Sequence, residues 1–226
     1  MSQEMKYFYL KNHPMLALLP EIKLSEAIAI AKIRTVYRGE QISYGEGGYT
    51  RIHFLIKGKV KITDNSDANN DLIKDILTEP DIFGDLGLEG KINNYESAES
   101  LTANTIICTF HVADFRRILE DNPMMALSYA QKVNCKLQRL ENRHADLVFL
   151  DTKDRLIRFI KNWARTEGNN MGDKIILNNY LTHSDIAGFI ATSRQSVNML
   201  LNELRTSGLL YYTRKHIELN NPVAWN

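Results

Sequence analysis

Residues 122–150 limit the possible folds more than any other stretch, because they predict one long helix. They contain no glycine, and their only proline, Pro123, stands where a helix tolerates one, in its first turn. Seven residues recur at alternating spacings of four and three: Ala126, Ala130, Val133, Leu137, Leu140, His144 and Leu147. Such a heptad seam is typical of a helix that packs against a helix like itself.

The seam is compatible with two packing arrangements. It can face a second copy of the chain, while apolar residues off the seam pack on the helix's own domain: Met124, Met125, Leu127, Cys135 and Val148. Alternatively, the seam itself packs on that domain, as most amphipathic helices do. We favour a homodimer, with His144 as a polar residue that sets the register of the pair and not as a pH switch.

The residues before this helix predict a small β domain. From about 34 to 110, short runs rich in β-branched residues alternate with turn-forming stretches, which favours a sandwich or jelly roll. Around Gly58 the apolar residues alternate with polar ones and predict two half-buried strands: Phe54, Ile56, Val60 and Ile62. The turn signals are GEGG (45–48), DNSDANND (64–71) and GDLGLEG (84–90). A helical lead-in, roughly 14–32, precedes the strands.

The residues after the long helix predict a helical domain that ends in a β hairpin. TKDRLIRFIKNWART places Leu156, Phe159, Ile160 and Trp163 on one face of a helix. LLYYTRKHIEL reads as two short strands around the basic turn 214–216. Residues 151–226 hold 10 Lys and Arg against 7 Asp and Glu, whereas the first 150 hold 18 against 20. The C-terminal part is therefore the better candidate for contact with a polyanion.

Residues 181–210 predict a helix-turn-helix. Thr182 and Asp185 have the spacing of a capping box, and Ser193 is placed to cap a second helix that stops near Gly208. That helix has a core face at helical spacing: Val197, Leu200, Leu201 and Leu204. The opposite face is rich in hydrogen-bond donors and has no acidic residue: Arg194, Gln195, Asn198, Asn202 and Arg205.

A helix with such a face can enter the major groove of DNA, where Arg reads guanine and Gln or Asn reads adenine. Ser193, Ser196 and the free N–H groups of the first turn suit phosphate contacts. The alternative is a solvated face on an ordinary core helix. The tight turn, the caps, the hairpin and the local positive charge together favour DNA binding.

At this point the chain resembles the cyclic-AMP receptor protein / fumarate-nitrate regulator (Crp/Fnr) superfamily of bacterial transcription factors. Four motifs occur in family order at family spacing: GEGGYTRIHFLIKGKVKI, PDIFGDLGL, FLDTKDRLIRFI and LTHSDIAGFIATSRQSVNMLLNEL. The resemblance implies an α+β chain with a β-roll effector domain (1–121), a dimerisation helix (122–150) and a winged helix-turn-helix (151–226). It also implies a homodimer on a pseudo-palindromic operator and contact with RNA polymerase.

The resemblance places Ser193, Arg194, Gln195 and Met199 on the family's SRExxxR reading edge, and it brings Thr182 to a phosphate. Gln195 stands where Glu is usual, and Met199 where the cyclic-AMP regulators carry Arg. Because Glu accepts from cytosine and Gln prefers adenine, the operator is expected to differ from theirs.

PDIFGDLGL matches the family's phosphate cassette, in which backbone N–H groups hold a cyclic phosphate. This gives the candidate effector pocket: Gly84, Asp85, Leu86, Glu96, Ser97, Leu140 and Glu141. Asp85 replaces the Glu that meets the ribose, Glu96 replaces the Arg that neutralises the phosphate, and a carboxylate there would repel it. Leu140 and Glu141 replace the small polar residues that meet adenine, and Lys91 is a weak candidate for compensation.

We therefore expect no dependence on cyclic AMP. The cassette is then a structural turn, which we favour, or a pocket for another ligand. A cyclic-nucleotide-responsive regulator remains the first alternative function, and a ligand- or protein-binding module that does not act on DNA is the second.

No other chemistry is expected of this chain. Its two cysteines, Cys108 and Cys135, are too few for a disulfide framework or for the iron–sulfur clusters of some family members. The sequence has no metal-spaced His pair, nucleophile elbow, P-loop or dinucleotide fingerprint. Its first residues do not read as a signal peptide, and no apolar run has the length expected of a membrane span. We expect a cytoplasmic, non-enzymatic protein without cofactor or metal.

Overall fold

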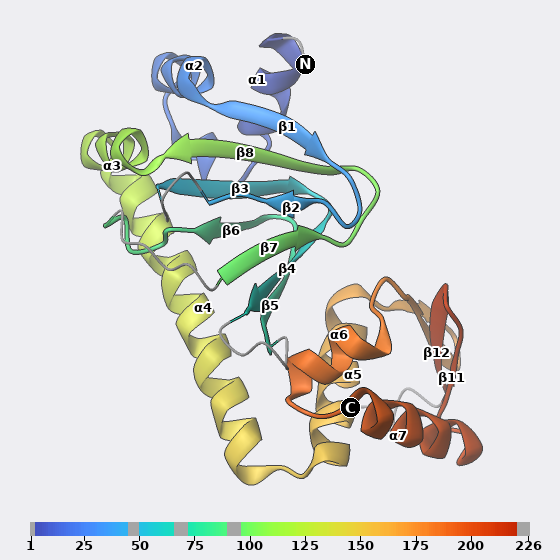
Figure 1. Ribbon diagram of the computed structural model, residues 1–226. Coiled ribbons are helices and arrows are strands. Elements are labelled where there is room, and N and C mark those ends of the chain that lie inside the picture. Colours follow the sequence, from blue (N-terminus) through green and yellow to red (C-terminus); the bar gives the residue numbers. More distant parts are fainter. Residues whose placement is uncertain (1–2, 45–49, 66–71, 90–95, 221–226) are drawn as a thin grey trace. The chain divides into compact units, whose positions relative to one another are not determined.

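The computed structural model describes residues 3–44, 50–65, 72–89 and 96–220. These residues form the predicted α+β architecture, with three antiparallel four-stranded sheets among them (Figure 1). The chain divides into two compact units, residues 1–139 and 140–226, so that the boundary falls inside the predicted long helix. The turn signal at 45–48 and residues 66–71 of the turn signal at 64–71 lie outside the described residues.

The chain begins with helices that the sequence predicted only in part. The lead-in expected at roughly 14–32 is a short 3₁₀ helix, η1 (Leu16–Leu18), followed by α2 (Glu21–Ile30). Pro20 interrupts it and stands as the N-cap of α2. An earlier helix, α1 (Gln3–Lys11), was not predicted. The Tyr7 hydroxyl donates to Glu21 Oε1 at 2.9 Å and joins α1 to α2.

Two antiparallel sheets make up the β part of the first unit. One has the order β1-β8-β3-β6 and the other β2-β7-β4-β5. The strands are β1 (Lys32–Val36), β2 (Gln41–Ile42), β3 (Arg51–Lys57), β4 (Lys59–Asp64), β5 (Leu72–Thr78), β6 (Asp81–Gly84), β7 (Glu96–Ser100) and β8 (Thr105–His111).

The predicted half-buried alternation is right for β4 and wrong for β3. In β4, Val60 and Ile62 are buried while the lysines beside them are partly exposed. In β3, Phe54 and Leu55 are both buried and Ile56 is only partly so. Because β3 is an interior strand, both of its faces are covered: Phe54 belongs to the core shared with the helices and Leu55 to the core between the sheets.

The long helix is α4 (Pro123–Phe149), which follows α3 (Val112–Asp121). Met125 packs into the core of the β domain as predicted, and Tyr129, one turn later, joins it. The other residues expected to pack there are exposed instead: Met124, Leu127, Cys135 and Val148. The prediction was wrong because α4 meets the β domain along one narrow stripe, which also takes in Ala126 and Val133.

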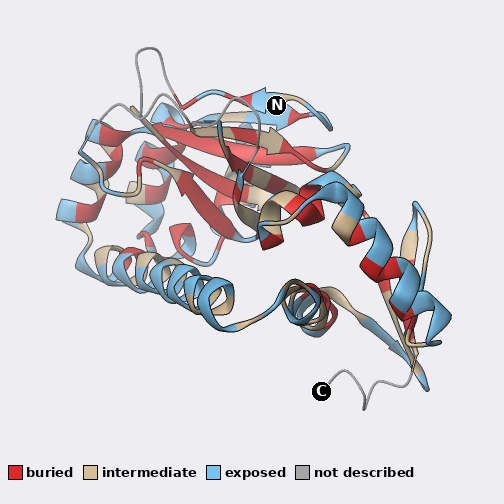
Figure 2. Cartoon of the chain, turned by 60° about the horizontal axis from the view of Figure 1, so that its bottom comes forward, coloured by how far each residue is buried: buried red, intermediate tan, exposed pale blue. Residues whose placement is uncertain are grey.

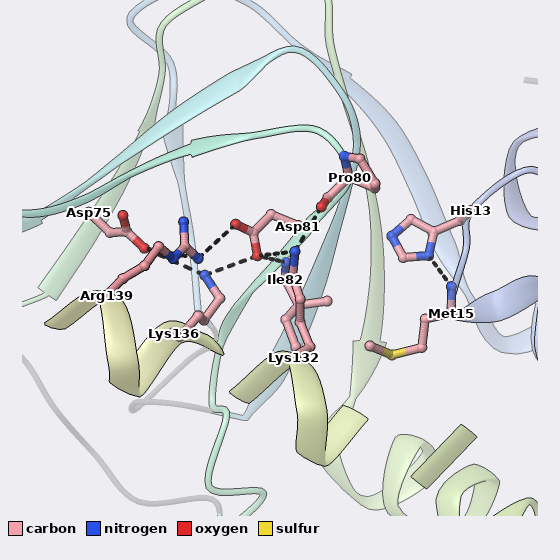
Figure 3. Close-up of polar contacts among 9 residues, drawn as sticks. All are labelled: His13, Met15, Asp75, Pro80, Asp81, Ile82, Lys132, Lys136 and Arg139. Carbon is pink, nitrogen blue, oxygen red and sulfur yellow. Dashed lines mark hydrogen bonds and ion pairs between the residues drawn. The ribbon is translucent and has the colours of Figure 1, made fainter. Parts of the chain in front are cut away.

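A buried carboxylate binds α4 to the β domain (Figure 3). Asp81, at the start of β6, is 3% exposed, and one face of α4 presents three cations to it. Lys132 Nζ and Lys136 Nζ lie 3.3 and 3.1 Å from its Oδ1, and an Arg139 nitrogen lies 3.3 Å from its Oδ2. Burial alone would raise the pKa of Asp81, but Lys136, Lys132 and Arg139 outweigh it and hold that pKa below its usual value.

The second unit contains α5 (Thr152–Glu167), α6 (His183–Ile190), α7 (Arg194–Thr206) and a sheet of order β11-β12-β10-β9. Its strands are β9 (Asn169–Met171), β10 (Lys174–Asn178), β11 (Leu210–Tyr212) and β12 (His216–Asn220). The predicted helix-turn-helix and β hairpin are confirmed. Among the described residues, no helix is both long and apolar enough to cross a bilayer.

Replacing Asp81 with Asn should lower the free energy of unfolding by about 2 kcal/mol, because it leaves the cations of α4 without their buried partner. Asp75→Asn is the matched control, since Asp75 contacts Lys136 and Arg139 only at 3.6 and 3.8 Å and its side chain is 31% exposed. Urea unfolding measures both variants, and an Asp81→Asn protein as stable as the control would contradict the assigned role.

Candidate nucleic-acid interface and effector cassette

The turn between α6 and α7 is built by local hydrogen bonds. Thr182 and Asp185 form the predicted capping box: Asp185 N–H donates to Thr182 Oγ1 at 3.0 Å, and Thr182 N–H donates to Asp185 Oδ2 at 2.8 Å. Ala191 ends α6 in the left-handed conformation with φ of 53°. Ser193 then caps α7 by accepting from Ser196 N–H at 3.0 Å. These contacts define where the second helix begins.

Helix α7 has one buried and one exposed face (Figure 2). The predicted core residues are all at most 7% exposed: Val197, Leu200, Leu201 and Leu204. The residues predicted to read bases are all exposed: Arg194, Gln195, Asn198, Met199 and Asn202. Glu203 is an exposed carboxylate of α7 that the sequence pattern did not single out, and it pairs with Lys153.

The residues predicted to meet phosphate are also at the surface. Thr182 and Ser193 are exposed and Ser196 is half-buried. Their hydroxyls already take part in the caps, and the Ser193 and Ser196 hydroxyls share a hydrogen bond of 2.9 Å. In the hairpin, Thr213 Oγ1 accepts from Lys215 N–H at 3.2 Å, and Arg214 and Lys215 are exposed.

Two aromatic side chains beside this surface were not singled out from the sequence. The His183 ring, in the first turn of α6, packs edge-on against the Tyr212 ring at 5.4 Å between centroids. The Tyr212 hydroxyl donates to Asn202 Oδ1 at 3.3 Å, which joins the hairpin to α7. Partial burial and the nearby Arg194 guanidinium lower the pKa of His183.

Arg155 of α5 supports the helix-turn-helix from behind. Its Nε donates to Ile190 O at 3.0 Å, at the end of α6, and another nitrogen donates to Leu150 O at 2.9 Å, before α5. A further contact of 3.4 Å reaches Ala191 O. One guanidinium therefore donates to carbonyls both in the turn between α4 and α5 and in the turn between α6 and α7. Nothing in the local pattern around Arg155 singled it out.

The candidate effector cassette uses its backbone groups internally. Gly84 has φ of +99°, and a Cβ there would lie 2.4 Å from Arg51 O. Asp85 N–H donates to Arg51 O at 3.0 Å and Leu86 N–H donates to Gly84 O at 2.9 Å. The Tyr129 hydroxyl donates to Leu86 O at 2.6 Å and so ties the cassette to α4. The N–H groups of Asp85 and Leu86 are thus engaged within the protein.

Glu96 and Ser97 of the predicted pocket bond to other residues of the β domain. Glu96, on β7, pairs with Lys74 at 2.9 Å, and Ser97 accepts a hydrogen bond of 3.2 Å from Asn65. Leu140 and Glu141 are exposed and belong to the second unit. Lys91 lies outside the described residues.

The cysteines and possible metal ligands offer no further site in the described part of the chain. Cys108 is buried, which raises the pKa of its thiol, and Cys135 is exposed on α4. No group of His, Cys, Asp and Glu suited to a metal ion occurs among the described residues.

The second unit matches a known family. The model of the Crp-like helix-turn-helix domain matches residues 154–224, which contain α6, α7 and the hairpin.

Relatives extend the similarity over most of the chain. A global nitrogen regulator of Synechocystis sp. is 26% identical over 85% of this chain and 86% of its own length. A CRP-like cAMP-activated global transcriptional regulator of Mycobacterium tuberculosis is 25% identical over 78% of each chain.

Solved structures share the fold. The c-di-GMP-responsive global regulator CLP of Xanthomonas campestris has a TM-score of 0.76 at 15% identity and covers 89% of this chain and 100% of that one. A CooA mutant from Carboxydothermus hydrogenoformans has a TM-score of 0.72 at 21% identity over 87% of each chain. The second unit thus carries a Crp-like helix-turn-helix domain, and over most of its length the chain is similar to DNA-binding transcription regulators of the Crp/Fnr type.

Proposed function

We propose that two copies of this chain bind a pseudo-palindromic operator, each through the exposed face of α7. The observation that carries the proposal is that face itself. Amide and guanidinium groups line it, while the opposite face is buried and the first turn is capped by Ser193. The protein acts by binding and not by catalysis, and contact with RNA polymerase in the cytoplasm converts operator binding into regulation.

The side chains of α7 indicate which bases are read. Arg194, at the first position of the helix, suits the paired acceptors of guanine, and Gln195 and Asn198 suit the donor and acceptor of adenine. Thr182 and Ser193 lie at the starts of α6 and α7, where free N–H groups favour phosphate. The exposed Arg214 and Lys215 of the hairpin add phosphate contacts.

The exposed part of α4 supports the homodimer. Leu137, Leu140 and Leu147 of the seam are 51, 59 and 39% exposed, and Ala130 and His144 are exposed as well. Ala126 and Val133, near the start of the seam, pack partly on the β domain. The face for the partner therefore starts near the middle of α4, and a row of exposed residues at spacings of three and four, Leu137, Leu140, His144 and Leu147, fits a second copy of the same helix.

We also propose that cyclic AMP is not the effector. The N–H groups of Asp85 and Leu86 are already bonded within the protein. At the sequence position where the resemblance implies an Arg that neutralises the phosphate, this chain has Glu96, which pairs with Lys74. The cassette then serves as a structural turn after β6, and the Tyr129 hydroxyl of α4 binds it through Leu86 O.

Replacing Arg194 with Ala should weaken binding to an operator selected from random duplexes by about 1–3 kcal/mol, or roughly 5- to 140-fold, with base preference lost at one position per half-site. Fluorescence anisotropy across a salt series measures this. Arg165→Ala, an exposed Arg of α5, removes the same charge elsewhere and should have little effect. Weak salt dependence and an unaffected Arg194→Ala would instead favour a domain that docks a protein.

Replacing Leu137 with Glu should convert the dimer to monomers, because it introduces like charges where two helices meet. Sedimentation velocity gives the mass, and the monomer should lose most of its affinity for a two-half-site operator while keeping its fold. Gln138→Glu adds the same charge at the next exposed position and should remain dimeric. A wild-type protein that sediments as a monomer at all concentrations would contradict the dimer.

Titration of cyclic AMP into the wild-type protein should give no binding heat at micromolar concentrations, since the N–H groups of Asp85 and Leu86 have protein partners. The complex with operator DNA should have the same affinity with and without the nucleotide. Micromolar binding by isothermal calorimetry would show that the cassette opens to a cyclic phosphate and would overturn this part of the proposal.

A further inference from the structure

Met199 is an apolar side chain in the middle of a polar surface. It is 64% exposed, whereas the aliphatic side chains on the core face of α7 are at most 7% exposed. Gln195 lies one turn before it and Asn202 one turn after it on the same side of the helix. Any duplex that meets Gln195 must therefore also meet, or leave a gap beside, the Met199 thioether.

Base edges in the major groove offer one apolar group, the 5-methyl of thymine. The other groups there are hydrogen-bond donors and acceptors, which lose water without compensation when an apolar side chain covers them. A thioether has no donor, so Met199 cannot bind the O6 and N7 acceptors of a guanine. Its flexible chain can follow a methyl group over a range of positions.

The spacing on α7 limits where that thymine lies. One helical turn rises about 5.4 Å, whereas successive base pairs are about 3.4 Å apart. A base pair that meets Met199 is therefore one or two steps away from the base pair that meets Gln195.

We propose that Met199 specifies a thymine in each operator half-site by contact with its 5-methyl group, one or two base pairs from the adenine read by Gln195. This inference rests on the proposed function, since it names a base that the DNA-reading face selects. It assigns the specificity at that position to apolar contact alone, without a hydrogen bond.

Deletion of single methyl groups from the DNA tests the proposal directly. In an operator selected by the wild-type protein, each thymine is replaced in turn by deoxyuridine, which keeps every hydrogen-bonding group and lacks only the methyl. Wild-type affinity should fall about fourfold at one thymine of a half-site, the value of one buried methyl group, and about 15-fold when both half-sites are changed. Anisotropy titrations at constant salt measure these ratios.

Variants of α7 assign the effect to one side chain. Met199→Ala should bind the thymine and deoxyuridine operators equally, and Met199→Leu should keep most of the preference for thymine. Asn198→Ala, a change at the adjacent exposed position, should weaken binding overall but keep the full methyl effect. An operator with 5-methylcytosine at that position should bind wild type better than one with cytosine.

The outcomes separate this inference from the proposed function. Suppose that wild type binds the operator and that Arg194→Ala binds it more weakly. If no deoxyuridine substitution then lowers wild-type affinity, or if Met199→Ala loses as much affinity as wild type does, only the role of Met199 is overturned. If wild type binds no duplex above the non-specific level, the proposed function and the role of Met199 both fail.

Discussion

The ionic contact at Asp81 determines where α4 packs on the β domain of the first unit. A buried carboxylate at the start of β6 is stabilised only if cations surround it, and they come from one face of the helix. Met125 and Tyr129 add an apolar anchor nearer the start of α4. Together these contacts hold the β domain along a single stripe of α4 up to Arg139.

Beyond that point α4 has contacts of a different kind. The Arg143 guanidinium lies 4.5 Å from the centre of the Phe189 ring of α6, and Asp146 pairs with Arg158 of α5. Arg155 joins the start of α5 to the end of α6. Helix α6 is thus held through a ring face and its last carbonyls, while Arg194, Gln195 and Asn198 of α7 are exposed.

The sequence predicted the second unit better than the first, and the reason is physical. Caps and tight turns are made by residues three or four apart, so the roles of Thr182, Ser193 and Gly208 follow from short-range chemistry. The burial of Leu55 and the exposure of Leu127 depend on which elements cover a strand or a helix, and alternation within a segment does not carry that information. Asp81 was missed because its partners on α4 are distant in sequence, and Arg155 because its contact with Ile190 is. The direct readout by α7 and the pairing of α4 stay predictions.

The close approach at Gly84 has a consequence for how such chains are recognised. With 2.4 Å between a hypothetical Cβ and Arg51 O, every residue but glycine is excluded at this turn for steric reasons alone. The glycine pattern that marks nucleotide-binding relatives would therefore survive in a chain that had lost each contact to a nucleotide. The glycine pattern therefore indicates the path of the backbone, and the identity of any ligand depends on the side chains around that turn.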